Sequence, residues 1–180
     1  MFTLFFSRLL RVARLDAGIY AELKDDKAAT WQAVIVVIAV AIAHAILGVF
    51  FATRGNWNVL RSIIPGFQSE IIGWLVWATV MYLIGAHIFK SPVTYGAVLR
   101  TLGFAALPGV LYALGFISEA ILWISLLWRI ATIFIATRQV FGLGLVKSII
   151  LVAVGGVTGV AVVGATTLTT LQVLEWMGVR

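Results

Sequence analysis

Five long apolar stretches, separated by short polar segments, dominate the hydrophobic pattern of this chain of 180 residues. A helix needs about 20 apolar residues to cross the hydrocarbon core of a bilayer, and each stretch has close to that length. The pattern therefore predicts an all-α, polytopic transmembrane bundle of five helices within residues 31–180. The predicted spans are residues 31–51, 71–89, 95–116, 117–136 and 145–168.

Residues 1–30 are predicted to form a cytoplasmic arm outside the bundle. Over residues 1–15, apolar and basic side chains fall on opposite sides of a helical wheel. This pattern predicts an interfacial amphipathic helix whose arginines face anionic headgroups, although it also suits a basic flank that only orients the first span. The two sides are Phe2, Phe5, Phe6, Leu9 and Ala13 against Arg8, Arg11 and Arg14. These arginines also make the segment unlike a signal peptide.

Local signals refine the ends of the spans. Thr30 is predicted to cap the first span, and Ser91 followed by Pro92 to start the third helix. Pro108 has no N–H to donate to the carbonyl group of Phe104, so a kink is expected there. Between the first two spans, helical spacing predicts a short surface helix broken at Pro65-Gly66. The residues that recur at this spacing are Trp57, Leu60, Ile63, Ile64 and Phe67.

Composition supports a membrane location. The chain is 62% hydrophobic and 11% charged, with a mean hydropathy of +1.10. Water-soluble domains are nearer half apolar and a quarter charged, so lipid is the expected solvent of most of this surface. The net charge is +6, but the basic residues lie between apolar runs, which argues against nucleic-acid binding. The chain contains no cysteine, which excludes disulfides and thiolate metal sites.

The positions of lysine and arginine predict the orientation. Nine lie on the side of the arm and three on the other side, so the N-terminus is expected in the cytoplasm and the C-terminus outside. The nine are Arg8, Arg11, Arg14, Lys24, Lys27, Lys90, Arg100, Arg138 and Lys147, and the three are Arg54, Arg61 and Arg180.

No sequence motif indicates catalysis, so we expect no enzyme activity, no cofactor and no metal site. The chain contains no nucleophile elbow, zinc-binding helix or phosphate-binding loop, and His44 and His87 lack ligand spacing. No motif flanks Ser118 or Ser125, which disfavours a serine-type intramembrane enzyme.

Arg129 is the most informative single residue because an arginine deep in a span is costly and needs a partner. The candidate partners are Glu119, Glu70 and the carbonyl group of Phe104. Arg129 could serve packing or snorkelling, or it could line a ligand or conduction path.

A strip of small residues marks the fifth span. Gly155 and Gly159 form a GxxxG pair, and Gly164 extends it. Such strips let helix backbones approach closely. The sequence leaves open whether the partner helix is internal or belongs to another chain.

Two stretches together resemble the Ypt-interacting-protein family, the Yip-domain membrane proteins. Residues 19–37 and 98–112 carry the resemblance, in the same order and with the same spacing as in that family. The matching residues are Tyr20, Glu22, Asp26, Thr30, Gln32 and Ala33 in the first stretch, and Leu99, Arg100, Gly103, Phe104, Ala105 and Pro108 in the second.

The resemblance implies five spans and a cytoplasmic N-terminus. The sequence shows neither the longer cytosolic domain nor the Asp-Leu-Tyr-Gly-Pro element of the eukaryotic branch, which is linked to Rab-type GTPases. It therefore looks more like the prokaryotic branch, and GTPase binding is not carried over. On physical grounds, Arg100 could pair with Glu22 or Asp26 and dock the arm, and Gln32 could bond across helices near the interface. These two residues and Thr30 could equally be solvated flanks of the spans.

The sequence thus favours a non-enzymatic adaptor or accessory protein of a prokaryotic plasma membrane. Its expected partners are membrane lipids and another membrane protein or a second copy of itself. The alternative is a small transporter or channel that uses Arg129 and the kink at Pro108.

Overall fold

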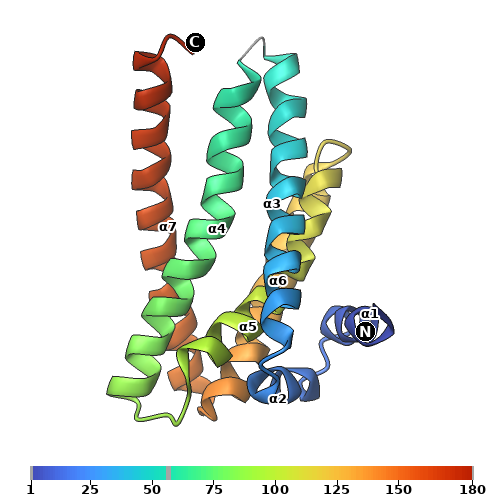
Figure 1. The fold of residues 1–180 in the computed structure, drawn as a ribbon, viewed down its shortest axis with the longest axis vertical. Helices are drawn as coiled ribbons and strands as arrows, with labels where there is room; N and C mark the ends of the chain where they lie inside the picture. The colour runs from blue at the N-terminus through green and yellow to red at the C-terminus, as the bar shows by residue number, and fades with distance from the viewer. Residues whose placement is uncertain (1, 56–57, 180) are drawn as a thin grey trace.

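Residues 2–55 and 58–179 are described by a computed structural model (Figure 1). Over these two ranges the regular structure is entirely helical, as predicted. The elements are α1 (Phe2–Ala13), α2 (Gly18–Asp25), α3 (Ala29–Arg54), α4 (Val59–Leu83), the π-helical η1 (Ile84–Ile88), α5 (Tyr95–Ala105), the 3₁₀-helical η2 (Leu107–Leu114), α6 (Glu119–Phe141) and α7 (Leu145–Trp176).

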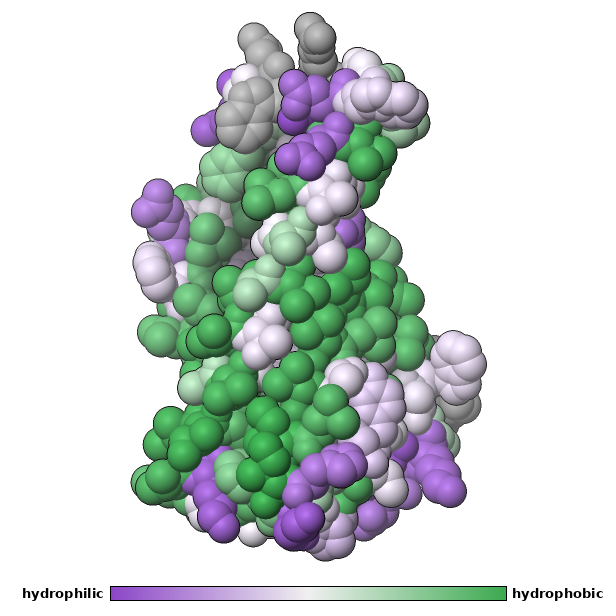
Figure 2. All heavy atoms as spheres, turned by 90° about the vertical axis from the view of Figure 1, so that its left-hand side faces the viewer, coloured by the Kyte–Doolittle hydropathy of each residue, from purple (hydrophilic) through white to green (hydrophobic). Residues whose placement is uncertain are grey.

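Five of the helical segments are long and apolar enough to cross a membrane, which confirms the five-span fold class. They are Ala29–Arg54, Val59–Ile88, Tyr95–Leu114, Glu119–Phe141 and Leu145–Trp176. The face in Figure 2 is apolar through its middle, and polar residues gather near both ends. The chain is therefore an integral membrane protein.

The predicted helix break at Pro65-Gly66 is wrong. Helix α4 begins at Val59 and continues through Pro65 without interruption, while Trp57 of the predicted surface helix lies outside the described residues. The side chain of Asn58 caps α4 by accepting a hydrogen bond from the Leu60 N–H group at 2.9 Å. Close packing on α3 supports the helix there, since a Cβ atom at Gly48 would lie 2.9 Å from the Ser62 carbonyl oxygen.

The capping predictions for Ser91 and Thr30 are also wrong. Thr94 caps α5 by accepting a hydrogen bond from the Ala97 N–H group at 3.3 Å, because Thr94 is the last residue with an extended backbone. The hydroxyl group of Thr30 donates to the Lys27 carbonyl oxygen at 2.8 Å instead, because α3 has already begun at Ala29.

The third span changes its helix type near Pro108. Helix α5 ends at Ala105, and the 3₁₀-helical η2 follows with Pro108 in its first turn. Two hydroxyl groups on α6 satisfy carbonyl groups at this change. Thr132 donates to the Ala105 carbonyl oxygen at 2.7 Å, and Ser125 donates to the Pro108 carbonyl oxygen at 2.8 Å. The junction between α5 and η2 is therefore hydrogen-bonded to α6.

The long helices form a layered bundle (Figure 1). Helix α4 packs against both α3 and α7, while η2 packs against α3 and α6. Short α1 lies to one side of the bundle, next to α2, α5 and η2. The main core gathers buried side chains from the arm and from every span, with Tyr20, Phe104 and Met81 among the largest.

Candidate functional site

An ion pair joins two spans inside the bundle. Arg129 of α6 donates from Nη1 to Oε2 of Glu70 on α4 at 3.0 Å, and from Nη2 to Oε1 of the same carboxylate. The side chain of Glu70 is 3% exposed. Glu70 is one of the three partners considered for Arg129 from the sequence. A buried ion pair of this kind compensates two charges that would each be costly alone.

His44 of α3 completes what we call the membrane cluster: Arg129, Glu70 and His44. Its Nδ1 atom lies 3.2 Å from Oε2 of Glu70, within ion-pair distance but without the geometry of a hydrogen bond. The imidazole ring stacks on Tyr112 of η2, with ring centroids 4.2 Å apart and planes 19° from parallel. The helix change near Pro108 therefore matters to the cluster, because η2 carries Tyr112.

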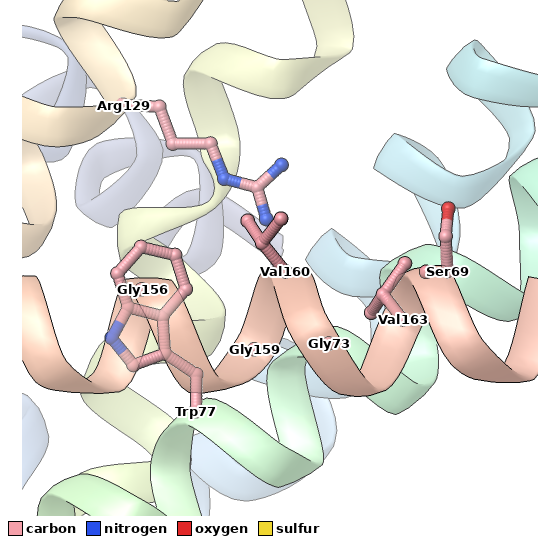
Figure 3. A pocket seen from close by; sticks show the side chains of 9 residues that line it. Ser69, Gly73, Trp77, Arg129, Gly156, Gly159, Val160 and Val163 are labelled. Carbon is pink, nitrogen blue, oxygen red and sulfur yellow. The ribbon is translucent and has the colours of Figure 1, made fainter.

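Two cavities reach the membrane cluster. The first, of about 340 Å³, lies between α4 and α7, and Arg129 projects toward its α7 wall (Figure 3). The second, of about 490 Å³, is bordered by α3, η2 and α6 and includes His44, Tyr112 and Glu119 among its lining residues. Arg129 thus borders the first cavity, and His44 borders the second.

The two glycines of the GxxxG pair have different surroundings: Gly155 packs against another helix, and Gly159 lines a cavity. Gly155 receives the indole ring of Trp77, since an added Cβ atom would lie 2.4 Å from the ring. A Cβ atom at Gly159 would meet nothing within 4 Å, and Gly159 lines the first cavity. At Gly155, therefore, the close approach is to α4 of the same chain.

A second polar group, the arm cluster, holds α1 and α2 onto the bundle. Arg8 donates to Glu22 at 2.9 and 2.7 Å, to Asp26 at 2.6 Å and to Gln32 at 2.9 Å. Arg11 also donates to Glu22, at 2.8 Å. We define the arm cluster as Arg8, Arg11, Glu22, Asp26 and Gln32. Gln32 lies on α3, so its bond crosses between helices.

Arg8 corrects the predicted orientation of α1. Its side chain is only 4% exposed and faces the carboxylates, so it does not face headgroups as the helical wheel suggested. The side chains that point outward include Leu4, Phe6 and Leu10, at 49, 60 and 57% exposure. A helical wheel of residues 1–15 cannot predict this orientation of α1, because the acids that bind Arg8 lie outside that segment.

The arm charges stabilise one another. Hydrogen bonds from Arg8 hold the pKa values of Glu22 and Asp26 below their usual range. Burial of Arg8 opposes its charge, but the bonds to Glu22 and Asp26 outweigh burial and raise its pKa. The two arginines and two acids of the arm cluster are therefore ionised at neutral pH.

Arg100 docks the arm, but not through the predicted acids. Its Nε atom donates to the Leu23 carbonyl oxygen at 3.0 Å, and its Nη2 atom donates to the Lys24 carbonyl oxygen at 2.5 Å. These carbonyl groups lie in the last turn of α2, where helical acceptors lack intrahelical donors and the helix dipole is negative. The carboxylates of Glu22 and Asp26 are already engaged by Arg8.

Tyr20 of α2 projects from the arm into the core of the bundle. It is fully buried, and its hydroxyl group has no hydrogen-bond partner within the described residues. Burial raises the pKa of this hydroxyl group above its usual value. Its place indicates a packing role, with the ring filling the space between α2 and the bundle.

Sequence reasoning missed two contributors. The helical wheel predicts a surface position for Arg8, although Glu22, Asp26 and Gln32 all offer it acceptors. Tyr112 was not singled out, because nothing local to η2 predicts that its ring stacks on His44. Over residues 2–55 and 58–179, no three His, Asp or Glu side chains gather as metal ligands would.

Comparison with known proteins identifies one family. The family model described as the Yip1 domain matches residues 17–167, most of the chain. No curated protein and no solved structure matches the chain. The match spans both sequence stretches that suggested the family.

Proposed function

Because this chain belongs to the Yip1 domain family, we propose that it is a non-enzymatic membrane protein that organises partner membrane proteins or lipids. The orientation of α1 carries this proposal. The arm cluster turns Arg8 inward and leaves Phe6 and Leu10, which lie one helical turn apart, exposed as an apolar strip. An apolar helix face held at the edge of a bundle suits contact with the membrane interface or with a partner helix.

The strip is preformed, which favours a binding role. Several hydrogen bonds fix α1 against α2 and α3, so the helix does not have to order itself when a partner arrives. The charges that hold it are compensated within the arm. The outward strip is thus left to make apolar contacts.

Purification in native nanodiscs tests the adaptor role. We expect a stoichiometric membrane partner, identified by mass spectrometry, to accompany the tagged chain. The double variant Phe6→Ser with Leu10→Ser should lose that partner, while Ser7→Ala, an exposed change on the same helix, should keep it. Retention of the partner by the double variant, or recovery of the chain with no partner, would count against the adaptor role.

Transport is the second candidate, because the membrane cluster borders two cavities. Transporters often place polar groups near irregular helices in the middle of the membrane, and η2 provides such a helix here. Solute-dependent flux in proteoliposomes would favour this role if it disappears in the uncharged pair Glu70→Gln with Arg129→Gln. Flux that is equal in empty liposomes would count against it.

We further propose that the chain lies in a prokaryotic plasma membrane with its N-terminus in the cytoplasm. The uneven distribution of lysine and arginine supports this orientation. The natural sequence has no cysteine, so single cysteines report topology cleanly. A membrane-impermeant maleimide added to intact cells should label Thr53→Cys and spare Lys27→Cys. The reverse pattern would invert the proposed topology.

A further inference from the structure

The residues that line the cavity between α4 and α7 suggest a ligand, and this inference does not depend on the adaptor role. Ser69, Gly73 and Trp77 form its α4 wall, and Arg129 enters from α6 (Figure 3). The α7 wall consists of Gly156, Gly159, Val160, Val163 and Gly164. The cavity therefore combines an apolar groove with one cationic side chain.

Missing side chains keep this groove open. A Cβ atom at Gly159 or Gly164 would meet nothing within 4 Å, so larger residues would fit without a clash at that atom. The two glycines are not needed there for close helix packing. They leave a volume of about 340 Å³ beside Arg129.

The polar groups of the lining residues are rich in donors. A guanidinium group carries five N–H donors, and Glu70 accepts from two of the nitrogens of Arg129. Each of these two nitrogens carries a second N–H group, and the arginine side chain, which is 16% exposed, reaches the cavity. A ligand that suits these N–H groups brings hydrogen-bond acceptors.

The charge balance restricts the ligand further. Glu70 already compensates Arg129, so a second anion would enter an apolar environment with little compensation. An uncharged acceptor avoids that cost. The cavity lies against the central part of α7, Gly156 to Gly164, deep within a 32-residue helix, so the ligand must dissolve in the middle of the bilayer.

We propose that this cavity binds a membrane quinone. A quinone head is uncharged and planar, and its carbonyl groups accept hydrogen bonds, for which Arg129 has N–H groups to spare. Its ring fits beside the indole ring of Trp77, and its apolar tail fits along the glycine groove of α7. A protonated fatty acid would add an O–H donor that a guanidinium group cannot accept, and an ionised one would add a second anion beside Glu70.

Photo-cross-linking in nanodiscs tests the proposal. The probe is an azido-quinone, and the labelled peptides are mapped by mass spectrometry. We expect labelling near Trp77 or in residues 156–164, displaced by decylubiquinone and not by palmitic acid. The variant Gly159→Leu fills the groove and should reduce labelling about tenfold. Ala161→Leu adds the same side chain at an exposed position of α7 and should leave labelling unchanged.

Other outcomes would overturn the quinone assignment. Equal displacement by palmitic acid would show a general site for single-chain lipids. Equal labelling of the Gly159→Leu and Ala161→Leu variants would place the label elsewhere. Absence of labelling in these peptides would show that the cavity does not bind a quinone. Thermal unfolding checks that Gly159→Leu remains folded, and Gly164→Leu provides a second filled cavity if it does not.

Discussion

Glu70 and Arg129 lie 59 residues apart and meet through two parallel hydrogen bonds within the bundle. The pair ties α4 to α6, two helices that pack mainly against other elements. It also lies next to His44 and borders the cavity that we assign to a quinone. A single ion pair therefore links two spans of the bundle and also borders, through Arg129, the cavity between α4 and α7.

Removing one member of this pair should destabilise the bundle strongly. We expect Arg129→Leu or Glu70→Leu to cost about 3–5 kcal/mol, because each leaves an uncompensated buried charge. The double variant should recover much of that loss, since it removes both charges. Unfolding in mixed micelles, followed by circular dichroism, measures this double-mutant cycle. Additive effects of the two single changes would show that the charges do not stabilise each other.

Arg8→Ala should release α1 from the bundle. The change removes hydrogen bonds to three different side chains and leaves Glu22 with only Arg11. Limited proteolysis should then cut the connection between α1 and α2 faster than in the natural protein. Arg14→Ala provides the control, because Arg14 is exposed and lies near the same connection. Equal cleavage of both variants would show that the arm cluster does not hold α1 against the bundle.

Arg100→Ala should loosen α2 by a separate route. Its guanidinium group satisfies carbonyl groups of the last turn of α2, and no acidic side chain is needed for these bonds. Hydrogen–deuterium exchange should rise in residues 18–25. Arg100→Lys should restore only part of the protection, because one ammonium group does not reproduce the planar fork of arginine. Unchanged exchange in both variants would contradict the docking role.

The arm should detach in acid. Glu22 and Asp26 have lower pKa values in the folded arm than in free chains, chiefly because of Arg8. Their stabilising effect is therefore complete above the usual carboxyl pKa of about 4 and is lost as pH falls through the lowered values. Proteolysis of the arm by pepsin should accelerate across this interval. The Glu22→Gln, Asp26→Asn variant should be cleaved readily at the higher pH as well. A flat profile for the natural arm would contradict this assignment.

Two glycines of α7 should respond oppositely to alanine. At Gly155 a methyl group would lie 2.4 Å from the Trp77 ring, which must then move, whereas at Gly159 it enters open space. We expect Gly155→Ala to cost about 1–3 kcal/mol, as overpacking usually does, and Gly159→Ala to be close to neutral. The free energy of unfolding of each variant measures the difference. Equal values would show that Trp77 does not pack tightly on α7.

The sequence by itself determined the class of this protein. Apolar stretches such as residues 31–51 are long enough to cross a bilayer, and hydropathy depends only on local composition. The two stretches around Tyr20 and Arg100 indicated the family for the same reason, since a short motif is also a local property of the sequence. The sequence also narrowed the partner of Arg129 to three groups, because a deeply placed arginine requires one.

Only the tertiary structure decided which groups meet. Arg8 turns inward because α2 folds back with Glu22 and Asp26, and a helical wheel of α1 contains no information about α2. Continuation of α4 through Pro65 depends on packing against α3, which outweighs the local tendency of proline to break a helix. The cavity beside Arg129 arises where glycines of α7 face α4, and distances between helices far apart in sequence cannot be obtained from either helix alone.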